Sequence, residues 1–103
     1  MPYYSLEKII AAANAQQIIY GGRKVNSDIA NLGYTLDEVA RCISQLKPEH
    51  YRKTHKFEDN STVYDDYVIE FSPQEEKPDS IYIKLRLLEN GEVQIGLGSF
   101  HLS

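Results

Sequence analysis

The sequence predicts one α+β domain in which N-terminal helices pack on a mainly antiparallel sheet of about four strands. Three observations support this fold class. Apolar side chains recur at helical spacing before position 48, polar and apolar side chains alternate after position 50, and the connections are short. Because the helices precede the strands instead of alternating with them, the two kinds of element should form separate layers.

Length and composition describe one ordinary globular domain. The chain has 103 residues, 42% of them hydrophobic and 25% charged, which suits a single core and not two. No apolar run approaches the ~20 residues of a membrane span, and the N-terminus lacks a secretory signal. We therefore expect a cytoplasmic location and no membrane contact. The one cysteine, Cys42, lies in a helical pattern, where a structural thiol is expected and a disulfide is excluded.

Two helices are expected in the first third of the chain. Ser5 should cap the first, which runs to about Ala15 with an apolar stripe along one side. Ile18–Tyr20 is a short apolar run that suits a brief extended segment. The second helix should span about Lys24–Leu32, and Gly33 follows it where helices often end in a left-handed residue.

A third helix should open at Thr35 and cover the sheet. Thr35 and Glu38 have the spacing of a capping box, in which each side chain satisfies a free backbone N–H. Pro48 should end the helix, because the residue before a proline is driven out of the helical region. Its expected apolar face comprises Leu36, Val39, Ala40, Ile43 and Leu46.

Two strands should follow the third helix. They are expected at Tyr51–Phe57 and Thr62–Phe71, with a turn over Glu58–Ser61 between them and a loop over Ser72–Asp79 after them. In the second strand Asp65 has the same parity as the apolar residues. An acid therefore interrupts an otherwise apolar face and requires a partner.

Ser80–Ser103 should form a β-hairpin around which the rest of the chain is organised. Asn90-Gly91 tolerates the positive φ angles of a type I′ turn. Apolar residues of the first arm should face the core, and its other residues should form a polar face. The apolar set is Ile81, Ile83, Leu85 and Leu87, and the polar set is Tyr82, Lys84 and Arg86.

The end of the returning arm predicts a β-bulge. Strict alternation from Val93 would bury His101 and expose Phe100, which reverses the usual preference. Gly96 and Gly98 can hold one extra residue. A bulge there would send Phe100 to the core and His101 to the polar face.

Charge is distributed unevenly along the chain. The formal net charge is −4, which argues against a general nucleic-acid binder. Lys47–Lys56 nevertheless holds four basic residues against one acid, whereas Glu58–Asp79 holds eight acids against one lysine. A small basic site bordered by acid suits a short anionic substrate; the alternative is a solvated surface with scattered charge.

A few polar residues are candidates for chemistry, although the common nucleotide-binding, zinc-protease and nucleophile-elbow motifs are absent. His101 could transfer a proton near neutral pH. Arg52 and Lys53 could bind a phosphate, and Tyr82 could donate to a phosphate or stack on a base. The alternative for each of them is an ordinary surface residue without a chemical role.

A metal site is not expected. His50 and His55 could join His101, but their separation suits neither one helical face nor a common zinc spacing.

The order of short motifs along the chain resembles the MqsR family of toxins. The motifs are Pro48-Glu49-His50-Tyr51-Arg52-Lys53, Val63-Tyr64-Asp65-Asp66-Tyr67, Ile81-Tyr82-Ile83-Lys84-Leu85 and Gly98-Ser99-Phe100-His101. The corresponding family stretches are approximately Phe-Tyr-Lys-Ser, Trp-Gln-Asp-Val-Tyr, Val-Tyr-Leu-Lys-Ile and Ser-Phe-Lys. The correspondence covers nearly the whole chain.

The resemblance implies a RelE-like fold over residues 1–103 and a metal-independent endoribonuclease that cleaves messenger RNA without a cofactor. It also implies neutralisation by a cognate antitoxin protein. By position, Arg52 matches the family's basic residue, Tyr82 its strand tyrosine and His101 its C-terminal lysine. Asp65 stands where the family has glutamine, so it should pair with a cation or act as the general base.

The mechanism implied is attack by the RNA's own 2′-hydroxyl on the adjacent phosphorus. Arg52 and Lys84 would bind the phosphate, His101 would transfer a proton, and Tyr82 would donate a hydrogen bond or relay a proton. Lys53 and Lys56 would guide the RNA backbone. Asp65 would pair with Arg52 or Lys84, or serve as the base.

Two non-enzymatic alternatives remain open from the sequence. One is a catalytically inactive protein of the same fold that retains only a protein contact. The other is a small interaction module whose acidic strand and loop bind a basic partner protein.

Overall fold

The computed structural model describes residues 1–57 and 61–103, and it has the expected α+β architecture. The helical elements are α1 (Leu6–Asn14), α2 (Arg23–Leu32), α3 (Leu36–Ser44) and a 3₁₀ turn, η1 (Pro48–His50). The strands are β1 (Ile18–Tyr20), β2 (Tyr51–Phe57), β3 (Thr62–Phe71), β4 (Asp79–Glu89) and β5 (Val93–Leu102). The turn expected over Glu58–Ser61 falls mainly on residues 58–60, outside the described part of the chain.

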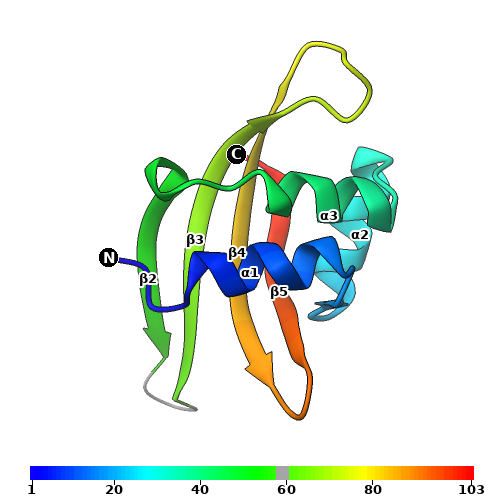
Figure 1. The fold of residues 1–103 in the computed structure, drawn as a ribbon. Helices are drawn as coiled ribbons and strands as arrows, with labels where there is room; N and C mark the ends of the chain where they lie inside the picture. Colours follow the sequence, from blue (N-terminus) through cyan, green and yellow to red (C-terminus); the bar gives the residue numbers. More distant parts are fainter. Residues whose placement is uncertain (58–60) are drawn as a thin grey trace.

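The strands form one sheet in the order β1-β5-β4-β3-β2, with five strands instead of about four. β1 supplies the fifth and runs parallel to β5, whereas all other neighbours are antiparallel. Figure 1 shows α1 and α3 crossing one face of the sheet, with α2 beside β5. In the described part of the chain, no helix covers the opposite face. None of the described helices is long and apolar enough to cross a membrane.

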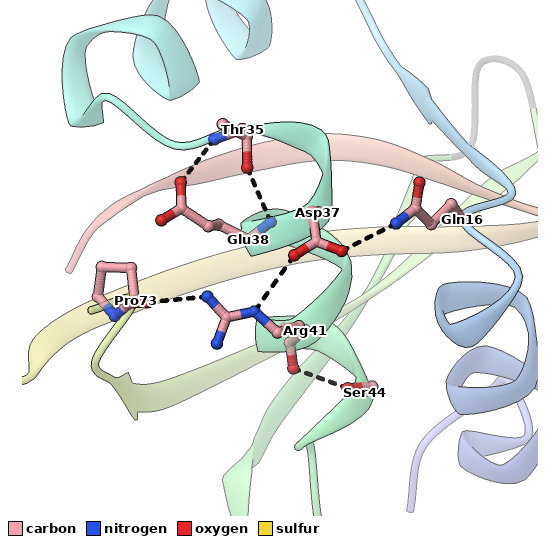
Figure 2. Close-up of polar contacts among 7 residues, drawn as sticks. All are labelled: Gln16, Thr35, Asp37, Glu38, Arg41, Ser44 and Pro73. Carbon is pink, nitrogen blue, oxygen red and sulfur yellow. Dashed lines mark hydrogen bonds and ion pairs between the residues drawn. The ribbon is translucent and has the colours of Figure 1, made fainter. Parts of the chain in front are cut away.

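The helix ends follow the local sequence. The Ser5 hydroxyl accepts a hydrogen bond from the Lys8 N–H, and Gly33 ends α2 at φ 75°. The capping box of Thr35 and Glu38 is present at the start of α3 (Figure 2). The end of α3 differs from expectation: it stops at Ser44, and Pro48 instead opens η1.

The apolar face of α3 is also narrower than expected. Leu36 is 41% exposed, whereas Val39, Ala40 and Ile43 are buried, as is Leu46 beyond the helix end. Leu36 is the first residue of the helix, ahead of the turns that pack on the sheet.

Arg41 of α3 fastens the loop between β3 and β4 (Figure 2). Its Nη2 donates to the carbonyl oxygen of Pro73 at 2.8 Å, and its Nε lies 3.5 Å from Asp37 Oδ2. The guanidinium also lies over the ring of Phe71, 5.6 Å from its centroid. One side chain thus connects α3 to the end of β3 and to the loop that follows.

The hydrophobic core fills the space between the helices and the sheet. It joins Ile9 and Val39 of the helices to Ile83, Leu97 and other inward residues of the strands. Cys42 belongs to this core and is fully buried. Burial raises the pKa of its thiol to about 12, so the thiol stays protonated and has a packing role, as expected.

The hairpin between β4 and β5 is present, but its turn is not type I′. Glu89 pairs with Val93, which leaves Asn90, Gly91 and Glu92 as a three-residue loop. Gly91 has φ 84°, and Asn90 does not have the positive φ that a type I′ turn requires. The prediction was wrong because Glu92 joins the loop instead of the strand.

The predicted bulge in β5 is confirmed. Lys84 pairs with Ser99 and Leu85 with Leu97, so Gly98 is the extra residue. Phe100 is consequently fully buried, and His101 pairs with Tyr82. One additional glycine therefore decides which residue type reaches each face at the end of β5.

Asp65 anchors the N-terminal segment to the sheet. Its carboxylate is fully buried on the helix-covered face. Oδ1 accepts from the Tyr3 N–H at 3.0 Å and from the Thr54 hydroxyl at 2.6 Å, and Oδ2 accepts from the Tyr4 N–H at 2.8 Å. The partner that this acid requires is thus a set of neutral donors.

We expect Asp65→Ala to lower the free energy of unfolding by about 2–3 kcal/mol, because it removes the buried acceptor of three partly buried donors. Urea unfolding followed by circular dichroism would measure this change. Glu70→Ala is the matched control, since Glu70 is an exposed acid on the same strand, and it should change stability by less than about 0.5 kcal/mol. Equal losses in the two variants would contradict the anchoring role.

Candidate active site

The face of the sheet opposite the helices, here called the open face, gathers polar and aromatic side chains from four strands. Pairing register and strand alternation assign residues to it. They are Lys53, His55 and Phe57 of β2; Tyr64, Asp66, Val68 and Glu70 of β3; Tyr82, Lys84 and Arg86 of β4; and Ser99 and His101 of β5. Most of the candidate chemistry in the chain is therefore on one surface.

Asp66 lies at the centre of the open face and holds two side chains. Its Oδ2 accepts a hydrogen bond from the Tyr82 hydroxyl at 2.7 Å and lies 2.7 Å from His55 Nε2. Burial, together with the hydrogen bond to Asp66, raises the pKa of the Tyr82 hydroxyl well above its usual range. Tyr82 therefore stays protonated at neutral pH and is a donor, not a base.

His101 lies beside Tyr82 on the neighbouring strand. The two ring centroids are 5.2 Å apart with an interplanar angle of 32°. His101 Nδ1 lies 2.8 Å from the carbonyl oxygen of Leu102. A carbonyl only accepts, so Nδ1 carries the hydrogen and Nε2 is left to exchange a proton with a ligand.

Lys84 and Arg86 bring positive charge next to an aromatic pair. Lys84 Nζ lies 5.4 Å from the ring centroid of Tyr64 and 5.8 Å from that of Phe57, and Arg86 Cζ lies 5.8 Å from that of Tyr64. Gly98 makes room for this arrangement, because a Cβ there would lie 2.9 Å from Tyr64 Cε1. Gly98 thus both permits the bulge and leaves space for the ring of Tyr64.

Four of the sequence-predicted site residues share the open face: His101, Tyr82, Lys84 and Lys53. Lys53 pairs with Asp66, which in turn pairs with Lys84. The buried carboxylate of Asp66 therefore has one cationic residue on each neighbouring strand, Lys53 on β2 and Lys84 on β4.

Arg52 is the extra residue of a second bulge, between Tyr51 and Lys53 on the edge strand β2. Its guanidinium is exposed and donates to the carbonyl oxygens of Glu49 and Tyr51 at 3.3 and 3.4 Å. Arg52 is thus at the margin of the sheet, two strands from Tyr82.

Asp65 and Lys56 are not brought into this site. Asp65 pairs with Leu85, and Lys56 pairs with Val63, so alternation directs both toward the helix-covered side. Asp65 does not pair with a cation, because neutral donors occupy its carboxylate. The carboxylate expected to act as the base therefore lies on the opposite face from Tyr82 and His101. Lys56 lines a groove with Tyr3 instead.

Two residues of the open-face cluster, His55 and Asp66, were not among the sequence-predicted catalytic residues. The alternation of side chains along β3 could have identified Asp66. Asp65 and Asp66 are adjacent in the strand, so one of the two acids had to face away from the core. His55 has the parity of Lys53 on β2. Their contact joins two strands and depends on register, which the sequence pattern does not fix.

The open face can support acid–base chemistry on an anion. It offers an imidazole with a free nitrogen, a phenol that remains a donor, and ammonium and guanidinium groups for negative charge. In the described residues, no group of three or more His, Cys, Asp or Glu side chains is arranged to hold a metal ion.

Comparison with known proteins gives one family match. A family model described as "Motility quorum-sensing regulator, toxin of MqsA" matches residues 1–101. The matched region includes all of the open-face residues and the whole sheet except Leu102, the last residue of β5. No curated protein matches the chain.

Proposed function

The chain belongs to the MqsR toxin family, and from this premise we propose that it is a metal-independent endoribonuclease that cleaves messenger RNA. The observation that carries the proposal is the meeting of His101, Tyr82 and Lys84 on one exposed face. These are the acid–base, hydrogen-bonding and cationic groups that cleavage of a phosphodiester requires. The toxin would act in the cytoplasm and be neutralised by a cognate antitoxin protein.

The proposed reaction uses the 2′-hydroxyl of the RNA as the nucleophile. The 2′-oxygen loses its proton and forms a bond to phosphorus, and the bond from phosphorus to the 5′-oxygen breaks as that oxygen gains a proton. The products are a 2′,3′-cyclic phosphate and a 5′-hydroxyl, and no water or metal is consumed. The protein needs to supply only proton transfer and charge stabilisation.

Each group has a role that its position supports. His101 exchanges a proton through Nε2, because Nδ1 is held by the Leu102 carbonyl. Lys84 stabilises the charge that develops on the phosphoryl oxygens. Tyr82 remains protonated and offers a neutral donor when its hydroxyl turns from Asp66 toward the phosphate.

The RNA strand would cross the sheet from β5 toward β2. Lys53 and Arg52 on β2 lie ahead of Lys84 along this path and would contact neighbouring phosphates. Phe57, 43% exposed, and Tyr64 meet edge to face at 5.9 Å and offer a ring surface for an unpaired base. A sheet face without covering helices suits single-stranded RNA, whose bases are free to stack.

We expect purified protein to cut RNA in the presence of EDTA and to leave the matching DNA intact. The product ends should be 2′,3′-cyclic phosphate and 5′-hydroxyl, which mass spectrometry distinguishes from 3′-phosphate ends. A single 2′-deoxy nucleotide at the cleavage site should block that cut, because the nucleophile is missing. His101→Ala protein purified in parallel controls for a contaminating nuclease.

Cleavage of DNA, or complete loss of RNA cleavage in EDTA, would contradict the proposed mechanism. In cells, induction of the gene should arrest growth, and co-expression of the cognate antitoxin should reverse the arrest. Arrest without any RNA cleavage would favour a non-enzymatic toxin.

A further inference from the structure

We propose that His55, oriented by Asp66, is a second proton-transfer residue of this site and divides the two proton transfers of RNA cleavage with His101. This inference rests on the proposed ribonuclease function and goes beyond it by assigning the second group. The reaction requires one group to remove the 2′-hydroxyl proton and another to protonate the leaving 5′-oxygen. His101 alone cannot occupy both positions in the same step.

His55 is held in a defined orientation on the open face. Its Nε2 lies 2.7 Å from Asp66 Oδ2, and its side chain is 30% exposed while that of Asp66 is only 7% exposed. An ionised carboxylate only accepts, so Nε2 carries the hydrogen. The other ring nitrogen, Nδ1, is left to exchange a proton with a ligand.

The same arrangement occurs at His101. Its Nδ1 hydrogen is held by a main-chain carbonyl, and its Nε2 is left over. Each imidazole thus has one nitrogen fixed on a protein acceptor and the other unassigned, which is how proteins set the tautomer of a working histidine. Among the three histidines of the chain, only His55 and His101 lie on the open face; His50 accepts the Lys47 N–H in η1 instead.

Asp66 and Tyr82 connect the two histidines across the sheet. The Tyr82 ring stacks beside the His101 ring, and its hydroxyl shares Asp66 Oδ2 with His55. The four side chains therefore form a continuous row from β5 to β2. A phosphate seated on Tyr82 beside Lys84 would have one imidazole on each side.

The hydrogen bonding of Asp66 is incomplete within the described part of the chain, which is typical of a functional residue and not of a structural one. Its Oδ1 is buried and has no hydrogen-bond partner among the described residues, whereas the adjacent Asp65 has both oxygens satisfied. A carboxylate buried with one oxygen unpaired costs folding free energy. We attribute this unfavourable burial to the role of Asp66 in orienting His55 and Tyr82.

Several charged and titratable groups lie around His55. Asp66 and Tyr64 face it from β3, Lys53 is on its own strand, and Tyr82 and Lys84 lie beyond Asp66 on β4. With two histidines sharing the work, the rate of cleavage should rise and then fall with pH. One histidine must be neutral and the other protonated in the active form.

The test compares His55→Gln, His101→Gln and the control His50→Gln with the wild type at saturating RNA. We expect kcat to fall by about 10²-fold or more for His55→Gln and His101→Gln and by less than about threefold for His50→Gln. Each active-site variant should lose one limb of the pH–rate profile. Affinity for 2′-O-methyl RNA, which cannot be cleaved, should stay within about threefold of the wild-type value in all three.

A second substrate separates the two roles. An RNA with a 5′-bridging sulfur has a leaving group that needs no proton, so it should restore cleavage by the variant that lacks the acid and not by the variant that lacks the base. Asp66→Asn should keep the fold, by thermal unfolding, and displace the pH limb that His55→Gln removes. That displacement distinguishes a positioning residue from one that only stabilises the sheet.

The inference would be overturned by full cleavage in His55→Gln, by an unchanged pH profile, or by rescue of both variants or of neither. If His55→Gln failed to fold, the Asp66→Asn pH profile would decide the question. These failures differ from failure of the proposed function, in which the wild-type protein itself would not cleave RNA.

Discussion

Replacement of His101 by alanine is expected to lower kcat for RNA cleavage by about 10²–10⁴-fold, the range for loss of a positioned acid or base. His101 is half-buried at the end of β5, and its ring centroid lies 5.2 Å from that of Tyr82. Its removal leaves the phosphate without a proton-transfer group on that side. Single-turnover cleavage of a short RNA would measure the loss, with binding of 2′-O-methyl RNA measured separately.

His101→Lys is the informative companion variant, because the MqsR family is expected to have lysine at this position. An ammonium retains positive charge beside Tyr82, so this variant should keep more activity than His101→Ala. Its rate should also lose the dependence on pH near neutrality that an imidazole provides. Wild-type cleavage by His101→Ala would remove this residue from the mechanism.

Replacement of Lys84 by methionine is expected to lower kcat by about 10²–10³-fold, the usual effect of losing one group that stabilises transition-state charge. Methionine preserves the apolar stem that packs beside Tyr64 and Gly98. The loss should therefore come from the missing charge and not from repacking. The measurement is kcat at saturating RNA, with the free energy of unfolding as a check on the fold.

Lys56→Met is the matched control for this second prediction. Lys56 lies within the same basic stretch of sequence as Lys53, but its register directs it toward the helix-covered side. It should cost less than about threefold in kcat. Equal losses for Lys56 and Lys84 would mean that the RNA does not lie on the open face.

Much of the secondary structure could be predicted from local pattern. β2 and β3 have the predicted bounds, and the caps at Ser5, Gly33 and Thr35 are in place. These features depend on residues within a few positions of one another, so the sequence displays them directly. The bulge at Gly98 was also predictable, because the alternative would have buried an imidazole and exposed a phenyl ring.

The candidate site was only partly predictable. Parity placed Tyr82 and Lys84 on one face, the predicted bulge added His101 to it, and the pairing of β4 with β5 bears this out. Parity puts the adjacent acids Asp65 and Asp66 on opposite faces, but it does not reveal which groups each of them contacts. Asp65 binds main-chain groups of residues more than 60 positions away, and no local pattern reports such a contact.

The sequence by itself determined the elements, the two faces of the hairpin and the family to which the chain belongs. Tertiary structure alone decided the parallel pairing of β1 with β5, the anchoring of the N-terminus at Asp65, and the row that joins His55, Asp66, Tyr82 and His101. The physical reason is the sequence separation of the interacting residues. Alternation and capping arise from neighbours along the chain, whereas a shared hydrogen-bond acceptor requires three strands to be held in register by the core behind them.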